Sequence, residues 1–141
     1  MSRGATRKKR ISDLLRLAKA ARLRAWAPYS RFRVGAALLA RSGKVYTGAN
    51  VENASYGLSL CAERVAFARA VSEGERKFSA LAVVTGSREP ATPCGACRQT
   101  LLEFGTDMRV YCANLKGDLL EDRASGLLPR RFGRGHLRKP R

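Results

Sequence analysis

The sequence predicts an α/β fold in which helices cover a mixed β-sheet, and three observations support this prediction. Ala80–Val84 is one continuous apolar run, which is typical of a strand buried on both faces. Two strand-like segments flank a Ser42-Gly43 turn, which indicates a β-hairpin. Apolar residues at helical spacing stand before and after these strands, so helices and strands alternate along the chain.

The first helix is expected to begin at Ser12 as its cap and to run to about Trp26, because Pro28 prevents its continuation. Residues 1–10 are expected to form a basic, disordered arm. Residues 11–137 then form a single domain, followed by a basic tail at 138–141. The apolar stripe of the first helix consists of Leu14, Leu15, Leu17, Ala18, Ala21 and Leu23.

Further strands and helices are expected to alternate through the rest of the domain. Strands are predicted at Val34–Ala40, Lys44–Ala49, Phe78–Thr85 and Met108–Ala113, helices at Leu60–Ser72 and Cys94–Phe104, and a short element near Leu127–Pro129. Tyr29–Arg33 and Asn50–Gly57 are expected to be loops.

The formal net charge of +17 lies almost wholly in the two flanks of the chain. Residues 34–115 carry nine Lys or Arg and seven Asp or Glu, whereas the flanks carry nineteen basic and four acidic residues. Basic flanks attract polyanions through counterion release. We favour solvated, partly disordered tails here, which leaves nucleic acid as an open but not preferred partner.

We expect no membrane-spanning helix, because the sequence has no run of eighteen or more apolar residues. Charged residues interrupt Ile11–Leu23, so the apolar segment that a signal peptide needs is missing. A cytoplasmic location follows as our expectation, and thiols stay reduced there. Close cysteines in that compartment indicate metal binding or catalysis rather than disulfides.

Three cysteines stand where a strand or loop passes into a helix. Cys94 and Cys97 are three residues apart, close to one helical turn, so both side chains can face one point. Cys61 opens the preceding helix and supplies a third ligand if the two helix N-termini lie side by side. Helix N-termini favour anions and lower the pKa of thiols, which suits three thiolates that bind Zn²⁺.

Glu63 follows Cys61 by two residues and indicates a catalytic zinc rather than a structural one. A structural site fills four positions with protein ligands, whereas a catalytic site keeps three and leaves the fourth to water. A carboxylate beside that position can take a proton from water and return it elsewhere. The sequence therefore predicts a zinc hydrolase in which Arg64 and Arg98 donate hydrogen bonds to the sulfurs.

Two other interpretations of the cysteines remain open at this point. The Cys94-x-x-Cys97 spacing is also that of a thioredoxin-like redox site, but that interpretation gives Cys61 and Glu63 no role. A closed zinc site needs a fourth ligand, and Cys112 is the remaining thiol. Its apolar strand pattern is explained more simply by a small buried side chain.

The cysteines belong to two motifs, Cys61-Ala62-Glu63-Arg64 and Pro93-Cys94-Gly95-Ala96-Cys97-Arg98-Gln99. These motifs resemble those of the zinc-dependent deaminases of cytosine and adenine. A cysteine as first ligand in a short chain is similar to the homotetrameric cytidine deaminases. The resemblance extends to Pro28–Ala37, Asn50–Tyr56, Leu127–Pro129 and Phe132-Gly133, and thus covers nearly the whole domain.

This resemblance implies a three-layer α/β/α sandwich with a mixed sheet of about five strands. It implies hydrolytic deamination of cytidine and 2′-deoxycytidine to uridine and 2′-deoxyuridine, with release of ammonia, in pyrimidine salvage. Cys61, Cys94 and Cys97 would bind one zinc ion per chain. Glu63 would accept the proton of water, protonate N3 of cytosine and help to expel ammonia from C4.

The resemblance also assigns substrate-binding residues. Asn50 and Glu52 would bind the sugar hydroxyl, which suits an amide and a carboxylate on one loop. Turn chemistry at a strand end is the alternative for Asn50. Phe32 would pack against the nucleoside, where ordinary core packing is the alternative, and the backbone at Ala62 would help to hold the base carbonyl.

Tyr56 and Phe132 would reach the site of a neighbouring subunit in a homotetramer, and ordinary core packing is again the alternative for Phe132. Arg33 and Arg134 stand where prolines are usual in the family, and His136 where an acidic residue is frequent. These departures bear on subunit contacts and leave the zinc ligands unchanged.

Two alternative functions would share the zinc residues. Deamination of a nucleoside antibiotic of the blasticidin S type is disfavoured by the Asn50 and Glu52 pair and by Phe132. A nucleic-acid cytosine deaminase or binding protein would use the basic flanks. Such editors usually have histidine as first ligand, and the nearly neutral middle of this chain offers no basic channel.

Overall fold

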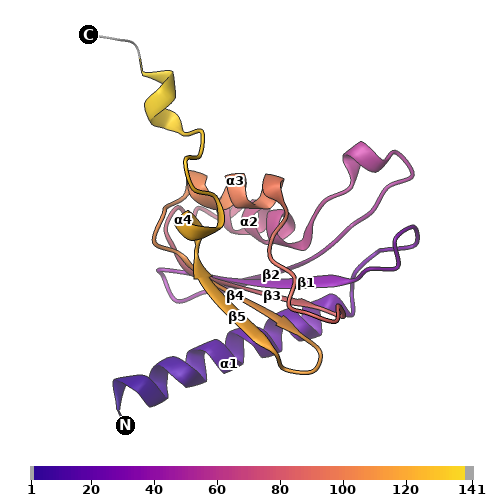
Figure 1. Ribbon diagram of the computed structural model, residues 1–141, viewed down its shortest axis with the longest axis horizontal. Helices are drawn as coiled ribbons and strands as arrows, with labels where there is room; N and C mark the ends of the chain where they lie inside the picture. The colour runs from indigo at the N-terminus through magenta and orange to yellow at the C-terminus, as the bar shows by residue number, and fades with distance from the viewer. Residues whose placement is uncertain (1, 139–141) are drawn as a thin grey trace.

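The computed structural model describes residues 2–138, whose centre is a five-stranded mixed sheet with the strand order β2-β1-β3-β4-β5. Helix α1 (Arg3–Arg22) covers one face of this sheet, while α2 (Ala62–Ser72) and α3 (Gly95–Glu103) lie over the other (Figure 1). The predicted α/β fold with a mixed sheet of five strands is confirmed. No helix within the described range is both long and apolar enough to cross a membrane.

The strands follow the predicted positions closely, and short helical segments fill the loops. The strands are β1 (Val34–Ala40), β2 (Val45–Ala49), β3 (Phe78–Thr85), β4 (Arg109–Asn114) and β5 (Leu119–Arg123). The short segments are η1 (Tyr56–Leu58), α4 (Ala124–Leu127) and η2 (Arg134–Leu137).

Strands β3 and β4 form the one parallel pair of the described sheet, with Ala80 opposite Arg109 and Thr85 opposite Asn114. Strand β1 is antiparallel to β2 and β3, and β4 is antiparallel to β5. A parallel pair needs a crossover, and α3 lies within it. The loop that follows β3 therefore leads from the carboxyl end of this strand directly to the start of α3.

Each face of the sheet is buried against a different set of helices. Leu38 of β1 belongs to the cluster that contains Phe67 of α2, whereas its neighbour Ala37 packs with Leu14 and Ala18 of α1. Successive residues of a strand point to opposite faces, so a strand covered on both sides is apolar throughout. This double coverage accounts for the continuous apolar run in β3.

The expected start of the first helix was wrong. Helix α1 begins at Arg3 and not after Ser12, and residues 3–10, expected to be a disordered arm, form its first two turns. The side chain of Ser2 caps the helix by accepting a hydrogen bond from the backbone N–H of Ala5. Arg, Lys and Ala have high helix propensity, and no proline interrupts residues 3–12.

Two further differences concern the end of the first helix and the last strand of the sheet. The first helix ends at Arg22 rather than at Trp26, whose backbone instead pairs with Asn50 and Glu52. Strand β5 was not among the strands predicted from the residue pattern, although Gly117 in a left-handed conformation marks the turn before it. Apart from Arg138, the expected basic tail lies outside the described residues.

Gly48 of β2 allows α2 to approach the sheet closely. A Cβ atom at this position would lie 2.4 Å from the carbonyl oxygen of Ala62 and 2.7 Å from the backbone nitrogen of Ala66. Backbone atoms of a helix cannot move aside individually, so any side chain here displaces the whole first turn of α2. The position of Cys61 and Glu63 over the sheet therefore depends on a glycine in the neighbouring strand.

We predict that Gly48→Ala destabilises the fold by about 1–3 kcal/mol, the usual cost of overpacking, and lowers zinc content in parallel. Gly4→Ala is the matched control, because its Cβ would meet nothing within 4 Å on the first turn of α1. Denaturant unfolding and metal analysis of both variants provide the measurement. A Gly48→Ala protein with unchanged stability and zinc content would contradict this role.

Candidate active site

Two helix N-termini meet above the sheet and carry the three predicted thiols. Cys61 is the N-cap residue of α2, and Cys94 is the N-cap residue of α3. Cys97 lies in the first turn of α3 and is buried. The positive end of each helix dipole therefore lies beside these cysteines, which favours negative charge there.

The three sulfurs form a compact cluster. The Sγ atoms of Cys61 and Cys94 are 3.6 Å apart, and all three Sγ atoms lie within 4.8 Å of one another. The neighbouring Cys97 thiol and the Arg64 guanidinium stabilise a thiolate at Cys61, which lowers the pKa of this thiol well below its usual range. Among residues 2–138, this is the group of His, Cys, Asp or Glu side chains that can hold a metal ion.

The donor set fits zinc. Two sulfurs that bind one tetrahedral zinc at about 2.3 Å lie about 3.8 Å apart, which is close to the separation of Cys61 and Cys94. Three thiolates suit a soft cation and leave one tetrahedral position open. The three protein ligands therefore match a catalytic zinc site more closely than a closed structural one.

Glu63 lies in the first turn of α2 and is buried, with 5% of its surface exposed. Burial raises the pKa of its carboxyl group, and the nearby Cys61 thiolate adds to this effect. A raised pKa makes the carboxyl group better able to hold a proton during a reaction near neutral pH. The position and environment of Glu63 therefore suit proton transfer.

The two arginines that follow the cysteines have different contacts. Nη2 of Arg64 lies 3.6 Å from Sγ of Cys61 and 3.4 Å from the carbonyl oxygen of Ser59. The buried Nε of Arg64 has no hydrogen-bond partner in residues 2–138. Arg64 thus places a positive charge beside the thiols, as expected, and offsets part of their negative charge.

The hydrogen bonds of Arg98 go to oxygen atoms, not to the sulfurs as expected. Its Nε donates to the carbonyl oxygen of Pro93 at 2.8 Å, and its Nη2 donates to Oγ1 of Thr92 at 2.7 Å. Its Nη1 donates to the carbonyl oxygen of Leu127 at 2.6 Å. Because the guanidinium is a rigid fork, Arg98 fixes the loop that carries Cys94 against α4.

A cavity of about 270 Å³ opens in front of the thiols and Glu63. Four of the predicted substrate-binding residues, Phe32, Asn50, Glu52 and Ala62, line it together with Cys61, Glu63 and Cys94. Residues that the sequence did not single out complete the wall: Ser30, Val34, Ser59, Leu60, Val83, Thr85, Ala91 and Thr92. The sequence could have indicated Thr85 as a lining residue, because it ends a predicted strand and ligands bind at the carboxyl ends of strands in α/β sheets.

Asn50 and Glu52 hold the loop that covers this cavity. Asn50 accepts a hydrogen bond from the backbone N–H of Val34 at 2.9 Å and donates to the carbonyl oxygen of Phe32 at 2.8 Å. Glu52 accepts from the hydroxyl and backbone N–H of Ser30 and from the N–H of Tyr29, and these bonds lower the pKa of its carboxyl group. Both side chains therefore have a structural task as well as a place in the cavity wall.

Tyr56 and Phe132 do not line the cavity. Tyr56 is 73% exposed, and its ring lies 5.8 Å from that of Tyr29 in an edge-on arrangement. Phe132 is 59% exposed and stacks on His136 at 5.4 Å. Its carbonyl oxygen accepts a hydrogen bond from Gln99 of α3 at 2.9 Å. Within one chain, neither ring belongs to the site formed by Glu63 and the cysteines.

Comparison with known proteins identifies the family of this chain. Residues 8–114 match the family described as the cytidine and deoxycytidylate deaminase zinc-binding region. The chain belongs to this family. Zinc is therefore the metal of the site, and Cys61, Cys94 and Cys97 are the residues that can hold it.

Individual relatives extend the similarity over most of the chain. Cytidine deaminase of Sporosarcina psychrophila is 50% identical over 128 residues, which cover 90% of this chain and 94% of the relative. Cytidine deaminase of Halalkalibacterium halodurans is 53% identical over 120 residues, with coverages of 84% and 91%. The crystal structure of cytidine deaminase from Burkholderia pseudomallei superposes with a TM-score of 0.82 at 47% identity, covering 94% of this chain and 100% of that one.

We predict that Cys94→Ala reduces zinc from about one ion per chain to a small fraction, because two thiols hold the metal weakly. Cys112→Ala is the matched control. Its thiol is buried in β4, and burial raises its pKa to about 12, so it stays protonated and free of metal. Metal analysis of both purified variants tests the assignment, and equal zinc loss in the two would contradict it.

Proposed function

We propose that this chain catalyses the zinc-dependent hydrolytic deamination of cytidine and 2′-deoxycytidine. The products are uridine or 2′-deoxyuridine and ammonia, which places the reaction in pyrimidine salvage. The observation that carries the proposal is the buried carboxyl group of Glu63 beside a three-thiol zinc site in the wall of one small cavity. Family membership and the named relatives support the same reaction.

Glu63 moves the protons that the reaction requires. Zinc, when bound, supplies a Lewis acid that makes water more acidic. Glu63 accepts a proton from the attacking water and delivers it to N3 of cytosine as oxygen bonds to C4. It then transfers the remaining proton, from the new hydroxyl on C4, to the amino group, so that the C4–N bond breaks, ammonia leaves and the C4 carbonyl forms. Its buried position keeps bulk water from competing for these protons.

The remaining cavity residues hold the nucleoside. The ring of Phe32 offers an apolar surface, and the backbone N–H of Ala62, near the positive end of α2, suits the carbonyl oxygen of the base. Asn50 and Glu52 provide donor and acceptor atoms for a sugar hydroxyl. Their bonds to residues 29–34 keep these atoms in place before substrate arrives.

The charge of the cavity favours a nucleoside over a nucleotide. The described residues that line it include the carboxylates of Glu52 and Glu63 but neither lysine nor arginine, in a chain with a net charge of +17. A phosphate group in this cavity would meet negative charge and no cationic partner. The family includes deaminases of both cytidine and deoxycytidylate. The absence of lysine and arginine from the described lining residues favours cytidine over deoxycytidylate as the substrate.

We also propose a homotetramer in the cytoplasm, where the thiols stay reduced. Support comes from large apolar side chains that are exposed in the single chain, among them Tyr56, Leu58, Phe132 and Leu137. In the assembly, Tyr56 and Phe132 would complete the cavity of a neighbouring subunit. Light scattering of the purified protein tests this, and a stable monomer with full activity would contradict it.

A substrate panel tests the proposed reaction. We expect turnover of cytidine and 2′-deoxycytidine at comparable rates, and a kcat/KM for cytidine 5′-monophosphate lower by about 10²-fold or more, since the cavity provides no partner for the phosphate. Formation of uridine and ammonia is measured for each compound. Preferred turnover of the monophosphate would contradict the nucleoside assignment, and turnover of neither would contradict the reaction.

A further inference from the structure

Helix α1 carries the largest net positive charge of the described helices and strands. Its twenty residues include eight Lys or Arg and one acidic residue, Asp13. Five of the cations lie in its first two turns, where every residue from 3 to 10 is exposed. These cations are Arg3, Arg7, Lys8, Lys9 and Arg10. They lie on a regular helix, so their spacing is fixed.

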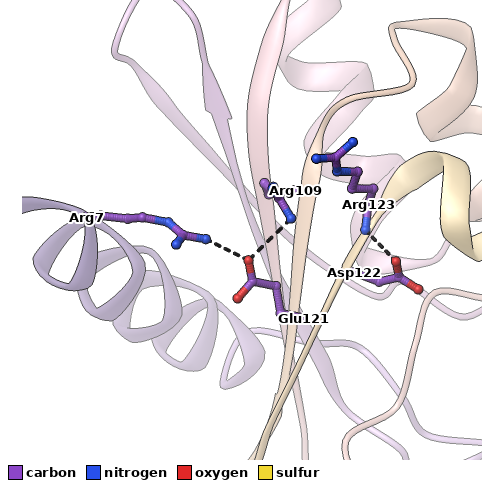
Figure 2. A network of polar contacts seen from close by, with 5 residues as sticks. All are labelled: Arg7, Arg109, Glu121, Asp122 and Arg123. Carbon is purple, nitrogen blue, oxygen red and sulfur yellow. Dashed lines mark hydrogen bonds and ion pairs between the residues drawn. The ribbon is translucent and has the colours of Figure 1, made fainter. Parts of the chain in front are cut away.

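The N-terminal half of α1 is anchored at the edge of the sheet. Nη2 of Arg7 lies 2.8 Å from Oε1 of Glu121 in the edge strand β5, and Nη1 of Arg109 lies 3.7 Å from the same oxygen (Figure 2). One carboxylate is thus shared by two arginines. It holds the helix in place but offers no ion pair to Arg3, Lys8, Lys9 and Arg10.

The arrangement is electrostatically unfavourable without an external anion. The first turn of α1 has no acidic residue, although the positive end of the helix dipole lies there. Arg3 and Arg7, four residues apart, are like charges on one face. In the described part of the chain, the ion pairs of α1 are those of Arg7 with Glu121 and of Arg16 with Asp13.

The distribution of the cations indicates a long polymeric anion. Arg3 to Lys19 spans about 24 Å along the helix at 1.5 Å per residue, which is too far for one small anion to contact. Residues 3–10 contain no large apolar side chain, so this segment has nothing to insert into a bilayer. A regular series of phosphates on a nucleic acid matches both features.

We propose that α1 binds the phosphate backbone of double-stranded nucleic acid without reading its sequence. The site is separate from the catalytic cavity, because α1 covers the opposite face of the sheet from α2 and α3 (Figure 1). The bound duplex is therefore not the substrate of Glu63, and this inference stands whether or not the proposed deamination is correct.

The test compares two variants of equal net charge. One replaces Arg3, Lys8, Lys9 and Arg10 of α1 with glutamine and keeps the ion pair of Arg7 with Glu121. The control replaces Lys77, Arg88, Lys116 and Arg130, four cations on other parts of the chain, with glutamine. Each change lowers the net charge of +17 by four. Binding of a labelled duplex of about 20 base pairs is measured by fluorescence anisotropy at several salt concentrations from about 50 to about 200 mM.

We expect the wild-type chain to bind two duplexes of unrelated sequence equally, with an affinity that falls steeply with salt. The α1 variant should bind about tenfold or more weakly at about 100 mM salt, and its salt slope should flatten by about 0.9 for each phosphate that it no longer neutralises. The control variant should stay within about threefold of wild type, since its cations are scattered over four separate segments outside α1. Both variants should keep wild-type deaminase activity.

Three outcomes would overturn the proposal. Equal weakening in both variants would mean that net charge alone attracts the duplex. Absence of wild-type binding at the lowest salt concentration would mean that α1 is only a solvated surface. Binding to phosphatidylserine vesicles that disappears in the α1 variant, together with no duplex binding, would assign the helix to a membrane surface instead.

Discussion

The site depends on the close approach of two helix N-termini, which places the Sγ atoms of their N-cap residues, Cys61 and Cys94, 3.6 Å apart. The parallel pairing of β3 and β4 directs the start of α3 to the carboxyl ends of these two strands. Gly48 allows the first turn of α2 to rest directly on β2. Hydrogen bonds between Val51 and Leu60 then tie the residue before Cys61 to the loop of Asn50 and Glu52.

Charge balance explains how these residues can lie close together. Three thiols and the carboxyl group of Glu63 are concentrated at one point, and the helix dipoles and Arg64 are the nearest positive charges. The cavity in front of them contains no lysine or arginine among its described lining residues, so the basic character of the chain does not extend into it. A neutral substrate is consistent with both conditions.

Much of the fold and of the zinc site can be predicted from the sequence because the signals are local. The apolar run of β3 and the spacing of Cys94 and Cys97 depend only on neighbouring residues. The start of α1 was missed because dense charge is also typical of disordered arms, whereas here Ser2 caps a helix of good helix formers. The partners of Arg98 were missed because the carbonyl of Leu127 reaches it only through the tertiary fold.

The most direct measurement of the central claim compares cytidine turnover and zinc content in the wild-type chain and in Glu63→Gln. We expect about one zinc per chain in both, with activity lower by about 10²–10⁴-fold in the variant, since glutamine cannot transfer protons. Glu73→Gln, an exposed change at the other end of α2, should retain wild-type activity. A Glu63→Gln protein that keeps zinc and substantial activity would exclude Glu63 as the group that transfers the protons.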